Sequence, residues 1–371
     1  MSKETHRSVS IAAPSLDDRE IERVSSVLES GRLAAGETVQ AFEESFAAYC
    51  ETDHAVATTN GTAALHTALE AAGVGPGDTV VTTPFSFVAS ANAIRLAGAE
   101  PVFADIDHET YSLDPHAVEA TIRERDGDVD ALLVVHLYGL PAAMAHLREI
   151  ATRYDLEVIE DACQAHGARF DGKPVGALGT VGCFSFYPTK NMTTAEGGMV
   201  VTDDEEIAER ARRFIDHGRT GSYEHANLGH NYRMTNVAAA IGEIQLGKLP
   251  EFNETRRANA RRLTERLEGL PVELPVEPPG RRHVYNQFTI RTQRRDELRE
   301  YLSEQGIDSA IYYPEPIHRQ PAYDHVSTNA PVAERTAREV LSLPVHPGLS
   351  EADVDAVGRA VRSAFEVTGD G

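Results

Sequence analysis

Short apolar runs alternate with stretches of helical periodicity along the first 250 residues of the chain. The runs predict strands at 54–59, 78–83, 100–106, 130–136 and 156–161, and a further pair at 181–187 and 197–202. The stretches between them predict helices at 61–72, 86–98, 114–123, 142–154 and 203–216. This alternation is typical of an α/β protein with a mostly parallel sheet.

The pattern changes after the last of these strands. Residues 217–234 are rich in Gly and Asn and predict an ordered loop, and two helices are predicted at 235–247 and 250–268. A Pro-rich stretch at 270–280 precedes apolar segments and helical patterns that predict a smaller α+β unit. We therefore expect a large domain over residues 1–250, including an N-terminal helical segment, and a small domain over 251–371.

Composition narrows the classes of protein that fit. The 371 residues carry a formal net charge of −23, spread along the chain, which argues against a nucleic-acid-binding surface. No apolar run approaches the roughly 20 residues that span a bilayer, and the first residues lack the apolar segment of a secretory signal. Three cysteines and fifteen histidines show no metal-ligand spacing, so no metal site is expected.

We accordingly expect a cytoplasmic protein with reduced thiols and with no membrane or nucleic-acid partner. The acidic excess also predicts a halophilic protein, with a surface adapted to concentrated salt, where charge repulsion is screened.

Lys190 stands out because lysine is scarce. The chain has four lysines against 31 arginines, and Lys190 lies in the aromatic, glycine-flanked run FSFYPTKNMTTAEGG (184–198). An amine can lose its proton and form a Schiff base, which a guanidinium cannot do. Taken alone, a surface lysine in a loop is the more common explanation.

Two further segments carry candidate chemistry. The strand at 54–59 leads through Asn60, Gly61 and Thr62 into a helix, an arrangement that suits an anion site or an ordinary helix cap. The strand at 156–161 ends in Glu160 and Asp161, where ligand sites form in α/β sheets, although a cap or surface charge is also possible there.

Together a lysine, a carboxylate and an anion site match the needs of pyridoxal phosphate (PLP). The chain also resembles the DegT/DnrJ/EryC1/StrS family of sugar aminotransferases over nearly its whole length. The resemblance is carried by motifs that include TTNGTAALHTAL, VIEDACQAHGA, CFSFYPTKN, GHNYRMTNVAAAIG and IYYPEPIHRQPAY, all in the family's order. It implies a fold-type I PLP-dependent transferase, with a mostly parallel seven-stranded sheet in the large domain.

The resemblance also implies a site. Lys190 would hold PLP as a Schiff base and then act as a base, Asp161 would pair with the ring nitrogen, and Gln164, one helical turn on, would reach the ring hydroxyl. Phe87 would stack on the ring. The phosphate would be held by Gly61, Thr62, Ser185 and, from the neighbouring subunit, Asn231, so a homodimer with shared active sites is implied.

The expected reaction moves an amino group from L-glutamate to a nucleotide-linked ketosugar, with pyridoxamine phosphate as the intermediate cofactor form. Relatives that have His in place of this lysine are dehydratases, so Lys190 favours transamination. The segment NMTTAEGG resembles that of members acting at C4 of a 4-keto-6-deoxyhexose. The substrate contacts are expected from the loop and from the YYPEPIH segment, at Arg219, Arg233, Tyr312 and His318.

Three alternatives stay open at the level of sequence. The same fold could serve a cyclitol or inosose aminotransferase, or an aminobenzoate-type synthase. A non-catalytic PLP-binding regulator is the third, and no DNA-binding motif or basic face in the sequence favours it.

Overall fold

The computed structural model describes residues 8–326 and 328–366. Its centre is a seven-stranded sheet of strand order β1-β9-β8-β5-β4-β2-β3, in which β9 runs antiparallel to both its neighbours and the other pairings are parallel. The strands are β1 (His54–Thr58), β2 (Thr79–Thr82), β3 (Glu100–Phe103), β4 (Ala131–Val135), β5 (Glu157–Asp161), β8 (Val181–Ser185) and β9 (Gly198–Thr202). All seven predicted strands and the expected α/β class are confirmed.

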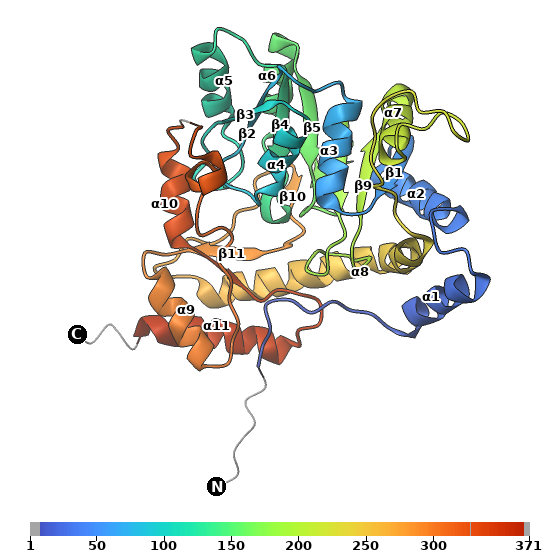
Figure 1. The fold of residues 1–371 in the computed structure, drawn as a ribbon. Coiled ribbons are helices and arrows are strands. Elements are labelled where there is room, and N and C mark those ends of the chain that lie inside the picture. The colour runs from blue at the N-terminus through green and yellow to red at the C-terminus, as the bar shows by residue number, and fades with distance from the viewer. Residues whose placement is uncertain (1–7, 327, 367–371) are drawn as a thin grey trace.

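Helices cover both faces of this sheet (Figure 1). Apolar side chains alternate along each strand, so that one set faces α2, α5 and α6 and the other faces α3, α4 and α7. These helices are α2 (Glu37–Cys50), α3 (Gly61–Ala71), α4 (Ala89–Leu96), α5 (Pro115–Glu124), α6 (Met144–Tyr154) and α7 (Glu205–Ile215). The parallel strands are buried on both faces, which explains why they read as continuous apolar runs.

A single long helix replaces the two helices predicted at 235–247 and 250–268. Helix α8 (Asn236–Leu267) continues through Pro250, although proline removes one backbone donor. Burial of Leu246, Lys248 and Leu249 against the rest of the fold offsets that loss. The predicted domain boundary at 250 therefore falls inside a helix, and the division of the chain into two domains stays a prediction.

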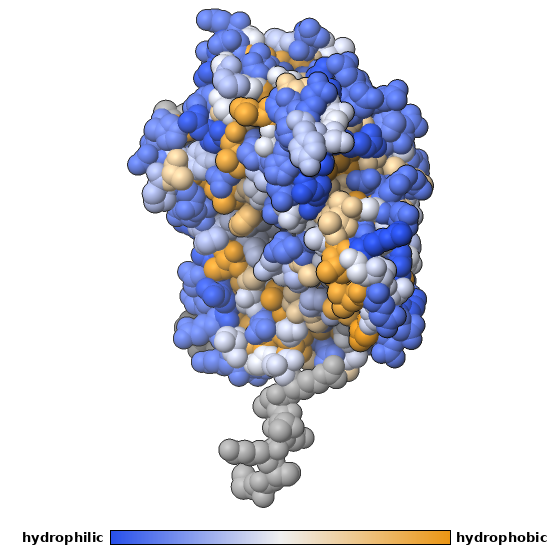
Figure 2. Space-filling model, turned by 45° about the vertical axis from the view of Figure 1, so that its right-hand side comes forward, coloured by the Kyte–Doolittle hydropathy of each residue, from blue (hydrophilic) through white to orange (hydrophobic). Residues whose placement is uncertain are grey.

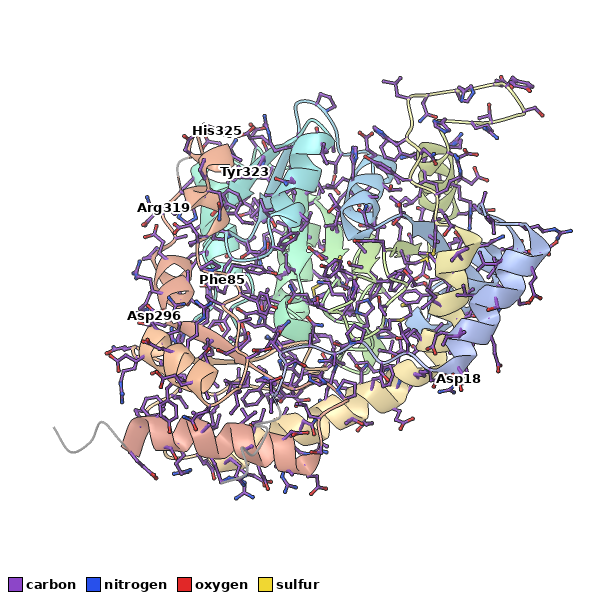
Figure 3. The ribbon with its side chains drawn as sticks, turned by 60° about the horizontal axis from the view of Figure 1, so that its bottom comes forward. Asp18, Phe85, Asp296, Arg319, Tyr323 and His325 are labelled. Atoms are coloured by element: carbon purple, nitrogen blue, oxygen red, sulfur yellow. The ribbon has the colours of Figure 1, made fainter. Side chains whose placement is uncertain are left out.

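Beyond α8 lies a smaller group of elements with its own apolar cluster, to which the second half of α8 contributes. Its parts are the strands β11 (Phe288–Arg291) and β12 (Val340–Leu343) and the helices α9 (Arg295–Glu304), α10 (Pro331–Glu339) and α11 (Glu351–Glu366). Figures 1 and 3 both show α11 alongside α8. Residues 308–313 form no strand, and among them only Ala310 makes an isolated bridge, to Ser342.

The remaining elements lie at the edges. Helix α1 (Asp18–Ser30) packs on α8, where Lys248 forms an ion pair with Glu20 at 2.5 Å. A small sheet joins β6 (Arg169–Phe170), β7 (Lys173–Pro174) and β10 (Arg281–Arg282), and three 3-10 turns are η1 (Leu137–Gly139), η2 (Ile317–Arg319) and η3 (Pro321–Tyr323). In the described part of the chain, no helix is long and apolar enough to cross a membrane.

Candidate active site

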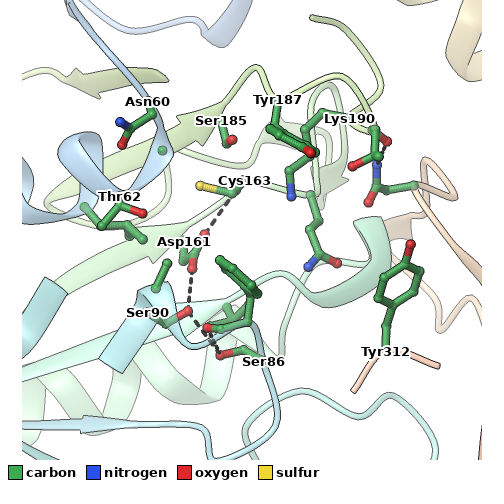
Figure 4. Close-up of a pocket in the computed structure, with 18 of the residues that line it drawn as sticks. Asn60, Thr62, Ser86, Ser90, Asp161, Cys163, Ser185, Tyr187, Lys190 and Tyr312 are labelled. Atoms are coloured by element: carbon green, nitrogen blue, oxygen red, sulfur yellow. Dashed lines mark hydrogen bonds between the residues drawn. The ribbon is translucent and has the colours of Figure 1, made fainter. Parts of the chain in front are cut away.

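A pocket of about 1010 Å³ opens where the carboxyl ends of β5 and β8 meet the start of α3 (Figure 4). This edge is where ligands bind in open α/β sheets. Eight of the residues predicted from sequence line it: Gly61, Thr62, Phe87, Asp161, Gln164, Ser185, Lys190 and Tyr312. Segments up to 251 residues apart in sequence therefore converge as the sequence analysis expected.

The N-terminus of α3 forms one end of the pocket. Asn60 is the cap residue, and its Oδ1 accepts a hydrogen bond from the Ala63 backbone N–H at 2.9 Å. The cap and the anion site are thus not exclusive, because Gly61 and Thr62 still face the pocket while Asn60 closes the helix. Free N–H groups and the helix dipole at this end favour a phosphate.

Gly61 is buried against Ser185, and a side chain at this position would have no room. A Cβ placed on Gly61 would lie 2.6 Å from Ser185 Cβ and 2.9 Å from Ser185 Oγ. Both contacts are shorter than Cβ atoms tolerate. The start of α3 therefore packs directly against the end of β8, and this close approach requires a glycine at position 61.

We expect Gly61→Ala to weaken PLP binding about 10- to 100-fold, because overpacking of about 1–3 kcal/mol must displace Ser185 or the helix start. The Kd is measured by fluorescence titration of the cofactor-free protein. Gly247→Ala is the matched control, since Gly247 lies in α8 with no atom within 4 Å of its built Cβ. Equal Kd values for the two variants would contradict the prediction.

Asp161 is the last residue of β5 and is held in place by hydrogen bonds to both carboxylate oxygens. Ser90 Oγ donates to Oδ2 at 2.7 Å, and the Cys163 N–H donates to Oδ1 at 3.2 Å (Figure 4). Ser86 Oγ donates in turn to Ser90 Oγ at 3.1 Å. The carboxylate is oriented into the pocket from a rigid strand end.

Glu160, the neighbouring carboxylate, has a structural position. Because side chains alternate across a strand, it points away from the pocket and is fully buried. Its oxygens accept from the backbone N–H groups of Gly176, Leu178 and Gly179 at 2.6–2.8 Å, and His136 Nε2 lies 2.8 Å from Oε2. Of the two acidic residues at the end of β5, only Asp161 lines the pocket.

Lys190 lies in the irregular segment between β8 and β9, with its backbone N–H donating to the Tyr187 carbonyl at 2.9 Å. Burial lowers the pKa of its amine, an effect that the nearby Cys163 and Asp161 partly oppose. A lowered pKa increases the share of neutral amine, which is the nucleophilic form.

Gln164 lies on the pocket wall in a turn, and the predicted helical turn between it and Asp161 is absent. Its Oε1 accepts from the Tyr138 backbone N–H at 2.8 Å, and its Nε2 donates to Tyr313 Oη at 3.0 Å. Phe87 is half exposed at the pocket wall, with its ring centroid 6.2 Å from that of Tyr313. Tyr313 therefore contacts both the side-chain amide of Gln164 and the ring of Phe87.

Tyr313→Phe is expected to lower kcat about 3- to 10-fold, because Gln164 loses a hydrogen bond worth about 1 kcal/mol that fixes its orientation. Steady-state kinetics would measure this loss. Tyr323→Phe is the matched control, as the Tyr323 hydroxyl donates to Asn92 Oδ1 at 2.7 Å, away from the pocket. The prediction fails if both variants lose the same activity.

Four predicted residues do not line this pocket. Asn231 is exposed in the loop that follows α7. Arg233 and Arg219 both form ion pairs with Asp216, the second at 3.7 Å. His318 is buried in η2, with Nε2 3.1 Å from Glu334 Oε1. It does not line the pocket of this protomer, although the sequence analysis expected a substrate contact there.

Several lining residues were missed by the sequence analysis. Ser86 and Ser90 flank Phe87 at a helical spacing that could have been noticed, and Tyr313 adjoins Tyr312. Cys163, Tyr187 and Tyr232 lie beside predicted residues in the same motifs. Asn286 and Gln287 carry no signal in the sequence, because their segment comes to the pocket only through the fold.

Comparison with known proteins identifies the family. The model of the DegT/DnrJ/EryC1/StrS aminotransferase family matches residues 14–362. A pleiotropic regulatory protein of Geobacillus stearothermophilus is 45% identical over 90% of this chain and 91% of its own length. The dTDP-3-amino-3,4,6-trideoxy-alpha-D-glucose transaminase of Streptomyces venezuelae is 44% identical, over 92% and 91% respectively. The chain belongs to the DegT/DnrJ/EryC1/StrS aminotransferase family.

Solved structures agree with this family assignment. Streptomyces venezuelae DesV, determined in complex with a ketimine intermediate, has a TM-score of 0.90 at 44% identity, covering 94% of both chains. The putative sugar aminotransferase Spr1654 of Streptococcus pneumoniae, in its PMP-form, has a TM-score of 0.92 at 25% identity, covering 97% and 98%. The expected fold, enzyme class and PLP dependence are confirmed.

The pocket of this aminotransferase fits its cofactor. The α3 N-terminus offers backbone donors to a phosphate, Asp161 offers an oriented carboxylate, and Lys190 offers an amine of lowered pKa. At the phosphate end Gly61 presents only backbone, because a Cβ there would collide with Ser185. Among the described residues, no cluster of three or more metal-ligating side chains occurs.

Proposed function

We propose that this aminotransferase moves an amino group from L-glutamate to a keto group of a nucleotide-linked sugar. The observation that carries the proposal is the presence of Lys190, Asp161 and the start of α3 in one pocket. Bound PLP supplies the electron sink that lets an α-proton leave. Its ring and phosphate leave part of a pocket of about 1010 Å³ for a substrate.

The chain's own residues supply positioning and proton transfer. Hydrogen bonds from Ser90 Oγ and the Cys163 N–H fix the orientation of the Asp161 carboxylate in the pocket. The Lys190 amine acts as a base when neutral and as an acid once protonated, and its lowered pKa brings both forms nearer to neutral pH. Gln164 and Phe87 bound the space in which a ring can lie.

The choice of substrate class rests on the names of relatives. They include a dTDP-sugar transaminase, a UDP-sugar 3-aminotransferase of Acidithiobacillus ferrooxidans at 40% identity and a GDP-perosamine synthase of Caulobacter vibrioides at 39%. What these names share is a nucleoside diphosphate sugar, with three different bases. This favours a nucleotide sugar over a cyclitol or an aminobenzoate precursor.

The predicted C4 position stays a proposal that rests on the NMTTAEGG segment. The names of relatives do not decide between C3 and C4, because the dTDP-sugar and UDP-sugar enzymes are named for position 3 and the name GDP-perosamine synthase states no position. NMR of the product formed from a 4-keto-6-deoxyhexose nucleotide tests it, and a C3-amino product would overturn it.

Absorbance spectroscopy tests the proposal as a whole. We expect the yellow holoenzyme to bleach when L-glutamate is added and to recover its colour when a nucleotide-linked ketosugar follows. The same experiment addresses the regulator alternative, since the Geobacillus relative bears a regulatory name. A bound chromophore that ignores glutamate and other amino donors would contradict the proposal.

We also propose that the enzyme is a homodimer with shared sites. Large apolar side chains are exposed on α1 and on the loop after α7, where Tyr223 and Leu228 are 96% and 93% exposed. Figure 2 turns this side forward and shows apolar surface among hydrophilic residues. If Asn231 reaches a neighbouring site, mixing Asn231→Ala and Lys190→Ala subunits should restore about a quarter of the activity. No recovery after subunit exchange would refute shared sites.

Adaptation to salt is proposed from the charge of −23. Because like charges repel, screening by salt should stabilise the fold. We expect the thermal unfolding midpoint to rise steadily between about 0.1 and about 2 M KCl, that is, from near physiological ionic strength to roughly thirteen times that value. A midpoint that is unchanged across this range would remove the support for a halophilic protein.

A further inference from the structure

The segment that carries Lys190 has little regular structure of its own. It joins β8 to β9, and its backbone makes only a few internal hydrogen bonds, among them Lys190 N–H to Tyr187 O at 2.9 Å and Thr194 N–H to Phe186 O at 3.0 Å. A catalytic amine must nevertheless stay within a fraction of an ångström of its place. Other parts of the chain must therefore hold this segment.

Three asparagine side chains form a continuous hydrogen-bonded chain next to Lys190. Asn286 Nδ2 donates to Asn191 Oδ1 at 2.9 Å, and Asn191 Nδ2 donates to Asn253 Oδ1 at 2.8 Å. Asn253 Nδ2 then donates to the His166 carbonyl at 2.8 Å. The chain therefore links the C-terminal part, the Lys190 segment, α8 and the turn that follows Asp161 and Gln164.

The contacts fall on both sides of Lys190. Asn191 follows it directly, and Asn286 Nδ2 also lies 3.4 Å from the carbonyl oxygen of Thr189, which precedes it. Asn191 Nδ2 makes a second bond, to the Val284 carbonyl at 3.1 Å. The residues before and after the catalytic lysine are thus tied to the segment around residues 284–286, some 95 positions away in sequence.

Burial makes these hydrogen bonds consequential. Asn191, Asn253 and Asn286 are 3, 4 and 5% exposed, so water cannot replace a lost partner. Each amide in the chain donates with its nitrogen and the next accepts with its oxygen, which is a consistent pattern of donors and acceptors. Asn286 also lines the pocket beside Lys190, whereas Asn253 does not.

We propose that Asn191, Asn253 and Asn286 are positioning residues that fix Lys190 in the pocket, and that through Asn286 its placement depends on the C-terminal part of the chain. The inference rests on the proposed role of Lys190 as the cofactor-binding base. It assigns a function to Asn253, a residue of α8 that is absent from the pocket wall and that would otherwise count as structural.

Asn253→Ala in the holoenzyme gives the sharpest test. The variant breaks the chain without removing any group from the pocket wall. Asn259→Ala is the matched control, because Asn259 is also a buried amide of α8, 8% exposed, but donates only to Val345 O and His346 O at 3.4 and 3.2 Å. The primary readout is hydrogen exchange of the peptide 184–198, and the second is the kinetics with glutamate.

For Asn253→Ala we expect exchange in 184–198 to accelerate about tenfold or more, since a buried hydrogen bond is lost. We expect kcat to fall roughly 10- to 100-fold, with KM for glutamate nearly unchanged, because a displaced base slows the chemical step more than binding. Asn259→Ala should leave both the hydrogen exchange of 184–198 and kcat as in the wild type. If Asn253→Ala does not fold, Asn191→Ala should give the same accelerated exchange.

Three results would overturn the inference. The first is unchanged exchange of 184–198 in the variant that breaks the chain, and the second is an equal change in the Asn259→Ala control. The third is faster exchange with unchanged kcat, since the segment would then be held for folding alone. Hydrogen exchange requires no substrate, so it can be measured even if the proposed reaction is wrong. Failure of the proposed function and failure of the positioning role are therefore distinguishable.

Discussion

Replacing Lys190 with alanine is expected to lower transamination by more than about 10⁴-fold, because the variant lacks the amine that we propose attaches the cofactor and acts as the general base. Lys190→Arg should be equally inactive, since a guanidinium keeps its proton. Single-turnover bleaching of the holoenzyme by L-glutamate measures the loss. Lys173→Ala, at an exposed lysine of β7, is the control that should remain active.

The same substitution should not destabilise the cofactor-free protein. Burial lowers the pKa of Lys190, so between that value and the ordinary 10.5 the unfolded chain binds more protons than the folded one. The lysine therefore disfavours folding at neutral pH, and this penalty shrinks as the pH rises toward 10.5. Chemical denaturation at pH 7 should show Lys190→Ala at least as stable as the wild type, and appreciable turnover by a folded variant would disprove the role of Lys190.

Asp161→Asn is expected to lower kcat about 10²- to 10³-fold, because a neutral amide removes the charge that we propose pairs with the cofactor ring nitrogen. The amide oxygen can keep one of the two hydrogen bonds that Asp161 accepts, such as the one from Ser90 Oγ at 2.7 Å, and we expect the fold to persist. Rapid kinetics of the glutamate half-reaction, with far-UV circular dichroism to confirm folding, provides the measurement.

Ser90→Ala is the graded control for this prediction. It keeps the Asp161 charge and removes one hydrogen bond that orients it, so a loss of roughly tenfold is expected. An Asp161→Asn variant as active as Ser90→Ala would show that orientation matters and the charge does not, contrary to the role proposed for Asp161.

The local part of this site could be predicted from the sequence because its signals are local. A buried parallel strand that ends in Asp161 and a strand that turns into a helix at Gly61 are patterns of adjacent residues, and both lie where they were expected. The resemblance to a known family added Phe87, Gln164 and Tyr312, which also line the pocket.

The long-range part could not be predicted. Asn286 reaches the neighbours of Lys190 from 95 positions away, and nothing in the sequence around it marks that contact. His318 shares a motif with Tyr312, yet packing directs it to Glu334 instead of the pocket. Pro250 should end a helix by its own chemistry, and only tertiary burial on both sides carries α8 through it.

The continuity of α8 bears on how new specificities could be made by recombining relatives. A crossover at residue 250 would join two half-helices whose buried faces were selected in different proteins, and would separate Asn253 from the Lys190 segment that it contacts. The Pro-rich stretch after Leu267 is the better junction, because it lies beyond the last turn of the helix. Chimeras joined there inherit an intact α8, and the contact of Asn286 with Asn191 is then the part of the asparagine chain that crosses the junction.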